Sequence, residues 1–467
     1  MRTLLTILFN LICITAFSQD TLQTLSLKNF LSIVKKYHPV AKQAEIVRQK
    51  ADAALLSQRG AFDPVISGGG NDKTFDGLNY YRSNSTQLSI PTWYGIEVKT
   101  GIEYVGGNRI NPEETAGKTS FAGISIPLAK NLLMDKRRAA LQQAKIMQQA
   151  SDAEKKTLLN DLLLDATEAY WQWVQAYLNF KTYEEVIRVN GQRYNMVKAA
   201  YRNGDRPAID TTEALTQLQQ FEYQQNEASL LWQNAAVQLS GYLWKAKNEP
   251  YVLPDMVFPQ EKMQDLQQAV IFPEKEQLIE DAKKNHPELA LYNFKLNALM
   301  VERKLKFQEL LPKIDLKYNQ LGKGYDLAST ATKTLFDNNY KYGVSFSIPL
   351  RLSSGRGEYK MAKLKITETQ LQQNQKQTDI INKVKKYYNQ LVNYQSQVAL
   401  LQRTYTAMLQ LQKGEETRFF NGESSLFLVN SRENKTQETM LKLIEATVKL
   451  NKTALGLQWA AGQLWQF

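Results

Sequence analysis

Five short segments of the sequence recur in the same order in its second half. The segment Tyr37–Val40 returns as Asn285–Glu288 after 248 residues, and both copies contain the dipeptide His-Pro. Recurrence in a fixed order is typical of a duplicated structural unit. The sequence therefore predicts two similar halves. The other pairs are Phe62–Ile66 with Leu310–Ile314, Ile124–Leu128 with Phe346–Leu350, Tyr201–Asp205 with Phe419–Glu423, and Gly241–Trp244 with Gly462–Trp465.

The spacing of these segments places an insertion in the first copy. The offset is 248 residues for the first two pairs but 222 for the third, so the first copy holds 26 additional residues between its second and third segments. Proline is concentrated between the copies, at Pro250, Pro254, Pro259 and Pro273, as expected for a linker. We expect a signal peptide at 1–18, a first repeat at 19–245, a Pro-rich linker at 246–273 and a second repeat at 274–467.

His38 and His286 occupy equivalent places in the two copies, each before a proline. A residue before proline is disfavoured in the helical region, whereas proline itself suits the first helical turn. We expect both histidines to mark helix starts rather than to bind a ligand.

The reactive side chains are few. With Cys13 and these two histidines as the whole inventory, no His/Cys metal cluster, Ser-His-Asp triad or Cys-His pair can be assembled. No Gly-x-x-x-x-Gly-Lys-Ser/Thr nucleotide-binding loop is present either. The sequence therefore predicts no enzyme, no bound metal and no cofactor.

The first residues have the pattern of a cleaved secretory signal. Arg2 supplies a positive start, Leu4–Ile14 is apolar, and Ala16 and Ser18 offer the small residues of a cleavage site. We expect Cys13 to leave with this signal, so no lipid anchor is predicted. The net charge of +12 could indicate a nucleic-acid partner, but an exported protein is not expected to have one. We therefore assign the charge to a solvated lysine-rich surface.

Two long stretches without proline predict long helices. The segment Leu132–Asn203 would extend about 108 Å at 1.5 Å per residue, which is longer than a globular domain needs. Its apolar residues recur every three or four positions, and we expect aromatic members such as Tyr170 and Trp173 to pack in a core rather than to line a ligand box. Shorter helices are predicted at Leu25–Tyr37, Pro39–Arg59 and Ala208–Trp244.

Glycine- and tyrosine-rich segments with alternating polarity, such as Thr86–Tyr104 and Tyr340–Ile348, predict strands. We expect two strand segments from each copy, hence four from the chain. Four strands are too few to close a barrel, and an open sheet cannot expose its edges to lipid. Several chains would then share one barrel. The alternative is a soluble β-rich domain with ordinary tyrosines.

Taken together, the signal peptide, the paired X-His-Pro helix starts, the repeated Ser-Ile-Pro-Leu strand ends and the two Asn-Gly turns resemble the TolC-type outer-membrane efflux factors. This resemblance implies an α+β membrane protein: a homotrimer with a 12-stranded outer-membrane β-barrel, four strands per chain, continuous with a long periplasmic α-helical coiled-coil barrel. It also implies contact with outer-membrane lipids, a periplasmic adaptor protein and an inner-membrane pump driven by protons or ATP.

By the same resemblance, the two Asn-Gly turns lie at periplasmic tips that dock the adaptor and close the tunnel. Glycine suits the positive φ that ends a helix. We expect some of the neighbouring charges to form inter-chain ion pairs that hold the tips shut, the alternative being that they only solvate the tips. The candidate residues are Gly204, Asp205, Arg206, Asp210, Arg418, Gly422, Glu423 and Arg432.

The predicted function is a passive outer-membrane duct of a tripartite efflux system. Within the same architecture, a duct for type I protein secretion is the alternative. From a different class, an exported coiled-coil scaffold without a pore would share the helical pattern.

Overall fold

The computed structural model describes residues 23–266 and 274–467. The predicted signal peptide and the end of the predicted Pro-rich linker lie outside these residues. The described residues divide into two compact units, one built from residues 23–44, 156–266, 274–286 and 379–467, the other from 45–155 and 287–378. Each unit takes segments from both predicted repeats, so the two copies are interleaved rather than folded one after the other.

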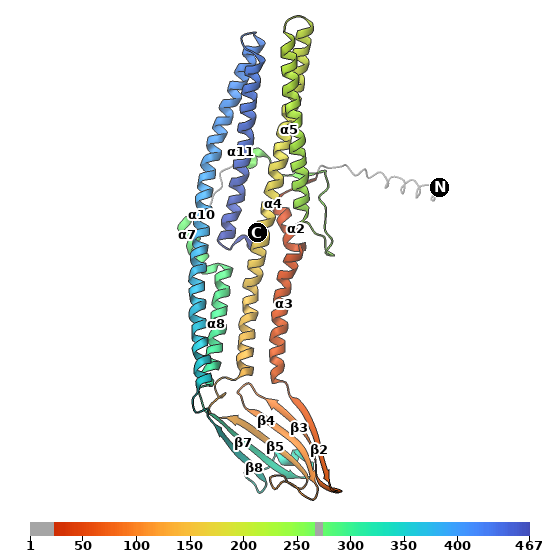
Figure 1. The fold of residues 1–467 in the computed structure, drawn as a ribbon, viewed down its shortest axis with the longest axis vertical. Coiled ribbons are helices and arrows are strands. Elements are labelled where there is room, and N and C mark those ends of the chain that lie inside the picture. Colours follow the sequence, from red (N-terminus) through yellow and green to blue (C-terminus); the bar gives the residue numbers. More distant parts are fainter. Residues whose placement is uncertain (1–22, 267–273) are drawn as a thin grey trace, which may run out of the picture. The chain divides into compact units, whose positions relative to one another are not determined.

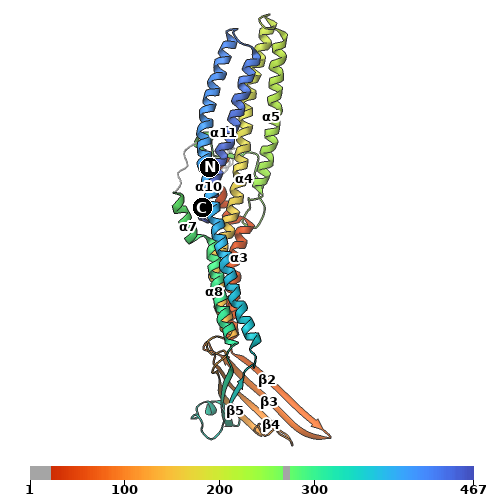
Figure 2. The ribbon, with the colours of Figure 1, turned by 60° about the vertical axis from the view of Figure 1, so that its left-hand side comes forward.

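The first unit contains the parts of two long helical hairpins that include their connecting turns (Figure 2). In one hairpin, helix α4 (Lys136–Arg202) turns into α5 (Ala208–Ser240), and in the other α10 (Ser353–Phe420) turns into α11 (Leu426–Ala460). The predicted long helix is confirmed to within a few residues at each end. None of the described helices has an apolar stretch long enough to cross a membrane.

An aromatic core holds the first unit together. Tyr170 and Trp173 of α4 are fully buried, and Phe30 of α2 (Leu27–Tyr37) stacks on Tyr170 with ring centres 5.5 Å apart. The Tyr170 hydroxyl donates to the Leu25 carbonyl at 2.8 Å and contacts the Glu261 carboxylate. Burial therefore raises the pKa of this phenol. The expectation that these aromatic residues form core is confirmed.

Short elements close this unit around the core. Strand β1 (Gln23–Leu25) pairs in parallel with β6 (Val257–Pro259), which lies in the Pro-rich segment together with α6 (Met263–Leu266). The chain continues through α7 (Lys275–Asn285) and ends in η2 (Leu464–Gln466).

His38 lies between α2 and α3 (Pro39–Arg59), and its Nδ1 accepts a hydrogen bond from the Val40 amide at 3.2 Å. His286 likewise separates α7 from α8 (Pro287–Gln308). Both histidines therefore mark helix starts, as the sequence predicts.

The second unit contains a six-stranded antiparallel sheet with the order β2-β3-β4-β5-β7-β8 (Figure 1). This corrects the expected number of two strands per copy, because the first copy supplies four. The strands are β2 (Val65–Phe75), β3 (Leu78–Pro91), β4 (Glu97–Gly106), β5 (Gly117–Pro127), β7 (Lys313–Lys323) and β8 (Tyr340–Ser347). Around the sheet lie η1 (Gly60–Phe62) and α9 (Leu327–Ala331).

The 26 additional residues of the first copy account for the extra strands. In the alignment of the two repeats, the start of β2 corresponds to the start of β7, and the end of β5 corresponds to the end of β8. Strands β3 and β4 are therefore the insertion. The segment Thr86–Tyr104, expected to be strand throughout, turns at Thr92–Ile96, where Gly95 has a φ of +82°.

The sheet has one apolar and one polar face. Successive side chains of a strand point to opposite faces, so the cross-strand pairs assign every residue to one of them. Apolar residues on one face include Ile66, Leu88, Val98, Ile124, Leu316 and Val344. The opposite face carries Ser67, Gln87, Lys99, Ser125, Lys317 and Ser345. The edge strands leave this apolar face open to solvent within the chain, with Ile66 76% and Val344 62% exposed. The segment that contains α9 covers part of the same face, where Ser120, Tyr318 and Gln320 are buried.

Candidate functional site

The two hairpin ends have the same backbone construction. Gly204 has a φ of +82° and Gly422 a φ of +78°, and the residue after each donates its amide to a carbonyl five positions earlier. These bonds are 2.9 Å long from Asp205 to Ala200 and 2.8 Å long from Glu423 to Arg418. This is the Schellman arrangement, in which a glycine in the left-handed region ends the helix and satisfies its last carbonyls.

Arg206 joins the two hairpin ends to each other. Its guanidinium donates to the Phe419 carbonyl at 2.8 Å and lies 4.2 Å from the centre of the Phe419 ring. Asp210, one turn later, approaches the same guanidinium at 3.7 Å. Arg206 of one hairpin therefore caps a backbone carbonyl in the last turn of α10, which belongs to the other hairpin.

A small apolar cluster lies behind this contact. It draws one or two residues from each of the four helices, namely Val197, Ala214, Phe419, Leu426 and Val429, all at most 5% exposed. The ends of α4, α5, α10 and α11 are thus packed against one another within one chain.

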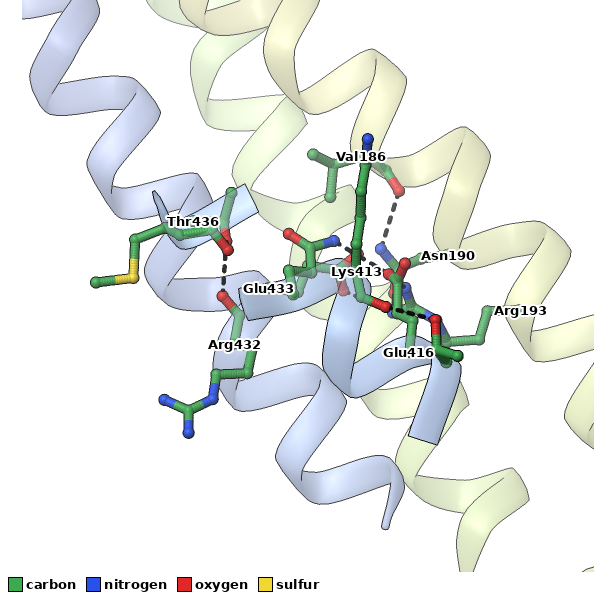
Figure 3. A network of polar contacts seen from close by, with 11 residues as sticks. Val186, Asn190, Arg193, Lys413, Glu416, Arg432, Glu433 and Thr436 are labelled. Carbon is green, nitrogen blue, oxygen red and sulfur yellow. Dashed lines mark hydrogen bonds and ion pairs between the residues drawn. The ribbon is translucent and has the colours of Figure 1, made fainter. Parts of the chain in front are cut away.

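A buried ionic network crosses between the hairpins one to three turns from the glycine turns (Figure 3). Arg193 of α4 donates to Glu433 of α11 at 2.8 Å and to Glu416 of α10 at 2.9 Å. The Arg193 and Glu433 side chains are 8% and 5% exposed. Asn190 accepts a further bond from Arg193 at 3.1 Å, so side-chain oxygens of Asn190, Glu416 and Glu433 all accept from this guanidinium.

Arg193, Glu416 and Glu433 are not among the residues predicted from the sequence. A signal was present, because Asn190, Arg193 and Val197 are buried residues at three- and four-residue steps, the spacing of a core stripe. A cation at such a position indicates a buried partner, but only the fold shows that the partner lies 240 residues away.

The predicted cations Arg418 and Arg432 converge on a carboxylate that was also missed. Glu415 is 10% exposed, and its oxygens lie 3.9 Å from Arg418 and 4.0 Å from Arg432. The Ser424 hydroxyl donates to the same carboxylate at 2.5 Å. Four of the predicted charges, Arg206, Asp210, Arg418 and Arg432, therefore already have partners within the chain.

Asp205 and Glu423 differ from these residues. Both are exposed, each directly after its turn glycine. Within residues 23–266 and 274–467, neither carboxylate has a hydrogen bond or ion pair. Arg418 contacts only the Glu423 backbone carbonyl, at 3.4 Å. The structure thus separates the predicted charges into an internally paired set and two exposed acids.

Comparison with known proteins finds one family. The sequence model described as outer membrane efflux protein matches residues 99–243 and 278–463. Comparison with curated proteins finds no match.

Several solved outer-membrane channels have a similar fold. The chain aligns with the channel OprN at a TM-score of 0.67 and 15% identity, covering 94% of this chain and 91% of OprN. The MtrE channel of Neisseria gonorrhoeae, solved in its open state, gives 0.67 and 14%, covering 94% and 89%. The CmeC channel of Campylobacter jejuni gives 0.64 and 15%, covering 94% and 86%.

Proposed function

Because this chain belongs to the outer membrane efflux protein family, we propose that its two hairpin ends form the closing gate and the adaptor-binding tip of an efflux duct. The chain is an outer-membrane channel of a tripartite efflux system, and it extends into the periplasm. Its family consists of passive channels rather than enzymes. In this role the duct carries substrates delivered by an inner-membrane pump, which is driven by protons or ATP.

The working form is a homotrimer in this proposal. A single chain leaves much of the apolar sheet face exposed and both sheet edges without a strand partner among the described residues. Lipid suits the apolar side chains, but it does not tolerate the unpaired backbone groups of an open sheet edge unless the sheet closes on itself. Three copies around one axis would turn the apolar faces toward outer-membrane lipid and the polar faces toward the lumen.

The proposal of a gate rests on the contrast between the two sets of charges at the hairpin ends. Arg206, Asp210, Arg418 and Arg432 are engaged within the chain and set the shape of the tip. The carboxylates of Asp205 and Glu423 are exposed and have no partner among the described residues. They are therefore the groups available to pair with cations of a neighbouring copy or of the adaptor. Rearrangement of such pairs by the adaptor would open the tip.

Single-channel conductance in planar bilayers tests this gate. The double variant Asp205→Asn/Glu423→Gln removes both free charges at nearly constant size, and it should raise the open probability of the purified trimer. Asp210→Ala and Arg432→Ala should raise it less, because their charges act within one chain. Glu185→Gln is the matched control, since Glu185 pairs with Arg188 in an exposed i,i+3 pair elsewhere on α4. If the double variant and the control gate identically, these acids do not hold the tip shut.

A second measurement concerns the adaptor. Co-purification of the pump complex with wild-type protein and with the double variant separates the two uses of the acids. Loss of the adaptor with unchanged conductance would place Asp205 and Glu423 in the docking surface alone. The transport energy source follows from the same preparation, because the co-purified pump either hydrolyses ATP or does not.

A further inference from the structure

The sheet of this chain has six strands, and its two edge strands are built to join (Figure 1). Strands β2 and β8 each pair on one side only among the described residues. Every neighbouring pair in the sheet is antiparallel, so β2 and β8 run in opposite directions. The β8 strand of one copy can therefore lie beside β2 of the next without interrupting the antiparallel order.

The faces of the two edge strands also match. On β2, Ile66 belongs to the apolar face and Ser67 to the polar face. On β8, Val344 belongs to the apolar face and Ser345 to the polar face. A β8–β2 junction would continue both faces around the assembly. The exposed apolar residues at the junction, Ile66, Val344 and Phe346, would then share one lipid-facing band.

The insertion is compatible with closure because it contributes an even number of strands. Strands β3 and β4 form an antiparallel pair between β2 and β5, so β5 still finishes at the same end of the sheet as β2 starts. The β3–β4 pairing is continuous from Arg82 opposite Gly106 to Pro91 opposite Glu97. This ladder has ten residue pairs, against nine between β4 and β5, so the added strands are integral to the sheet.

We propose that three copies of this chain close an 18-stranded barrel through β8–β2 junctions, not the 12-stranded barrel expected from two strands per repeat. This proposal rests on the homotrimeric channel proposed above. Barrel diameter grows roughly linearly with strand number, so the outer-membrane section would be about one and a half times as wide as a 12-stranded one.

Disulfide trapping tests which strands meet between copies. In a Cys13→Ser background, Ser345→Cys on β8 is combined in turn with Ser67→Cys, Gly69→Cys or Asn71→Cys on β2. All four positions lie on the polar face, and a Cβ at Gly69 has no heavy atom within 4 Å. At least one combination should give covalently linked trimers on non-reducing gels that separate on reduction.

The matched control pairs Ser345→Cys with Lys99→Cys on β4, also on the polar face. Cross-linking of this pair would mean that β4 is the edge and that β2 and β3 lie outside a 12-stranded barrel. Absence of any β8–β2 link in a trimer that is folded in the outer membrane would likewise overturn the proposal. Electron cryomicroscopy of the wild-type trimer provides an independent count, in which 18 strands support the inference and 12 refute it. A chain that forms no outer-membrane trimer at all would instead refute the proposed channel.

Discussion

Arg206 and Phe419 connect the two hairpin ends through one guanidinium, which donates to the Phe419 carbonyl at 2.8 Å and lies 4.2 Å from the ring centre. The two residues are far apart in the sequence and belong to different copies of the duplication. The contact therefore determines how the two repeats of one chain meet at the proposed gate. It requires a planar cation that can donate in its plane while stacking on a ring.

Replacing Arg206 with Lys should loosen this contact although the charge is kept. An ammonium group cannot both stack on the ring and keep the directed bond to the carbonyl. We expect amide hydrogen exchange around 201–210 and 419–426 to quicken about tenfold, given about 1 kcal/mol for each of the two interactions lost in part. Arg188→Lys, in an exposed pair with Glu185, serves as the control and should leave exchange unchanged. Equal exchange in both variants would show that the tips are held by packing alone.

The buried pair of Arg193 and Glu433 predicts strong coupling. Glu433→Gln leaves Arg193 buried with a weakened partner set, and loss of a buried charge partner costs about 3–5 kcal/mol. Arg193→Met should destabilise by a similar amount, because it leaves Glu433 buried without its cation. The double variant Arg193→Met/Glu433→Gln combines the same two substitutions, removes both charges and should recover much of the loss. Denaturant unfolding of all four proteins checks this, and additive single effects would contradict the coupling.

Gly422 and Gly414 offer a matched pair of Gly→Ala substitutions. Gly422 has a φ of +78°, where an added Cβ costs about 1–2 kcal/mol even though it meets no atom within 4 Å. Gly414 lies inside α10, and a Cβ there is also free of contacts, so alanine should stabilise by about 0.5–1 kcal/mol. Thermal unfolding should shift in opposite directions for the two variants. A lower melting temperature for both variants would indicate that Gly414 packs against another chain of the assembly.

His38 should make stability depend on pH. Partial burial lowers the pKa of its imidazole, and its Nδ1 must be unprotonated to accept from the Val40 amide. The unfolded state therefore binds the proton more readily. The stability contributed by neutral His38 is complete above the unfolded pKa of about 6.5, and it is lost as the pH falls below that value.

His38→Asn should flatten this dependence, because an asparagine oxygen at the same position accepts the amide bond at every pH. Melting temperatures of the variant and the wild-type protein between pH 7.5 and 5 provide the comparison. If the variant loses as much stability as the wild type on acidification, other groups are responsible.

The sequence was sufficient for features that depend on local order. Proline and glycine located the long helices, the helix starts at His38 and His286 and the turns at Gly204 and Gly422. Proline fixes φ and glycine permits a positive φ, whatever surrounds them. The apolar stripe containing Tyr170 and Trp173 identified part of the core, because helical periodicity can be read from the sequence itself. The duplication even recorded the insertion as 26 residues without showing what it forms.

Only the tertiary structure decided which residues meet. It converted the insertion into strands β3 and β4, because strand pairing depends on partners outside the segment. It also divided the tip charges, pairing Arg206 with Asp210 and with Phe419 and leaving Asp205 and Glu423 exposed. Arg193 and Glu433 escaped sequence analysis because an ion pair is defined by distance in space, and 240 residues of chain separate these two charges. The local rules thus determined the elements, and long-range packing determined the site.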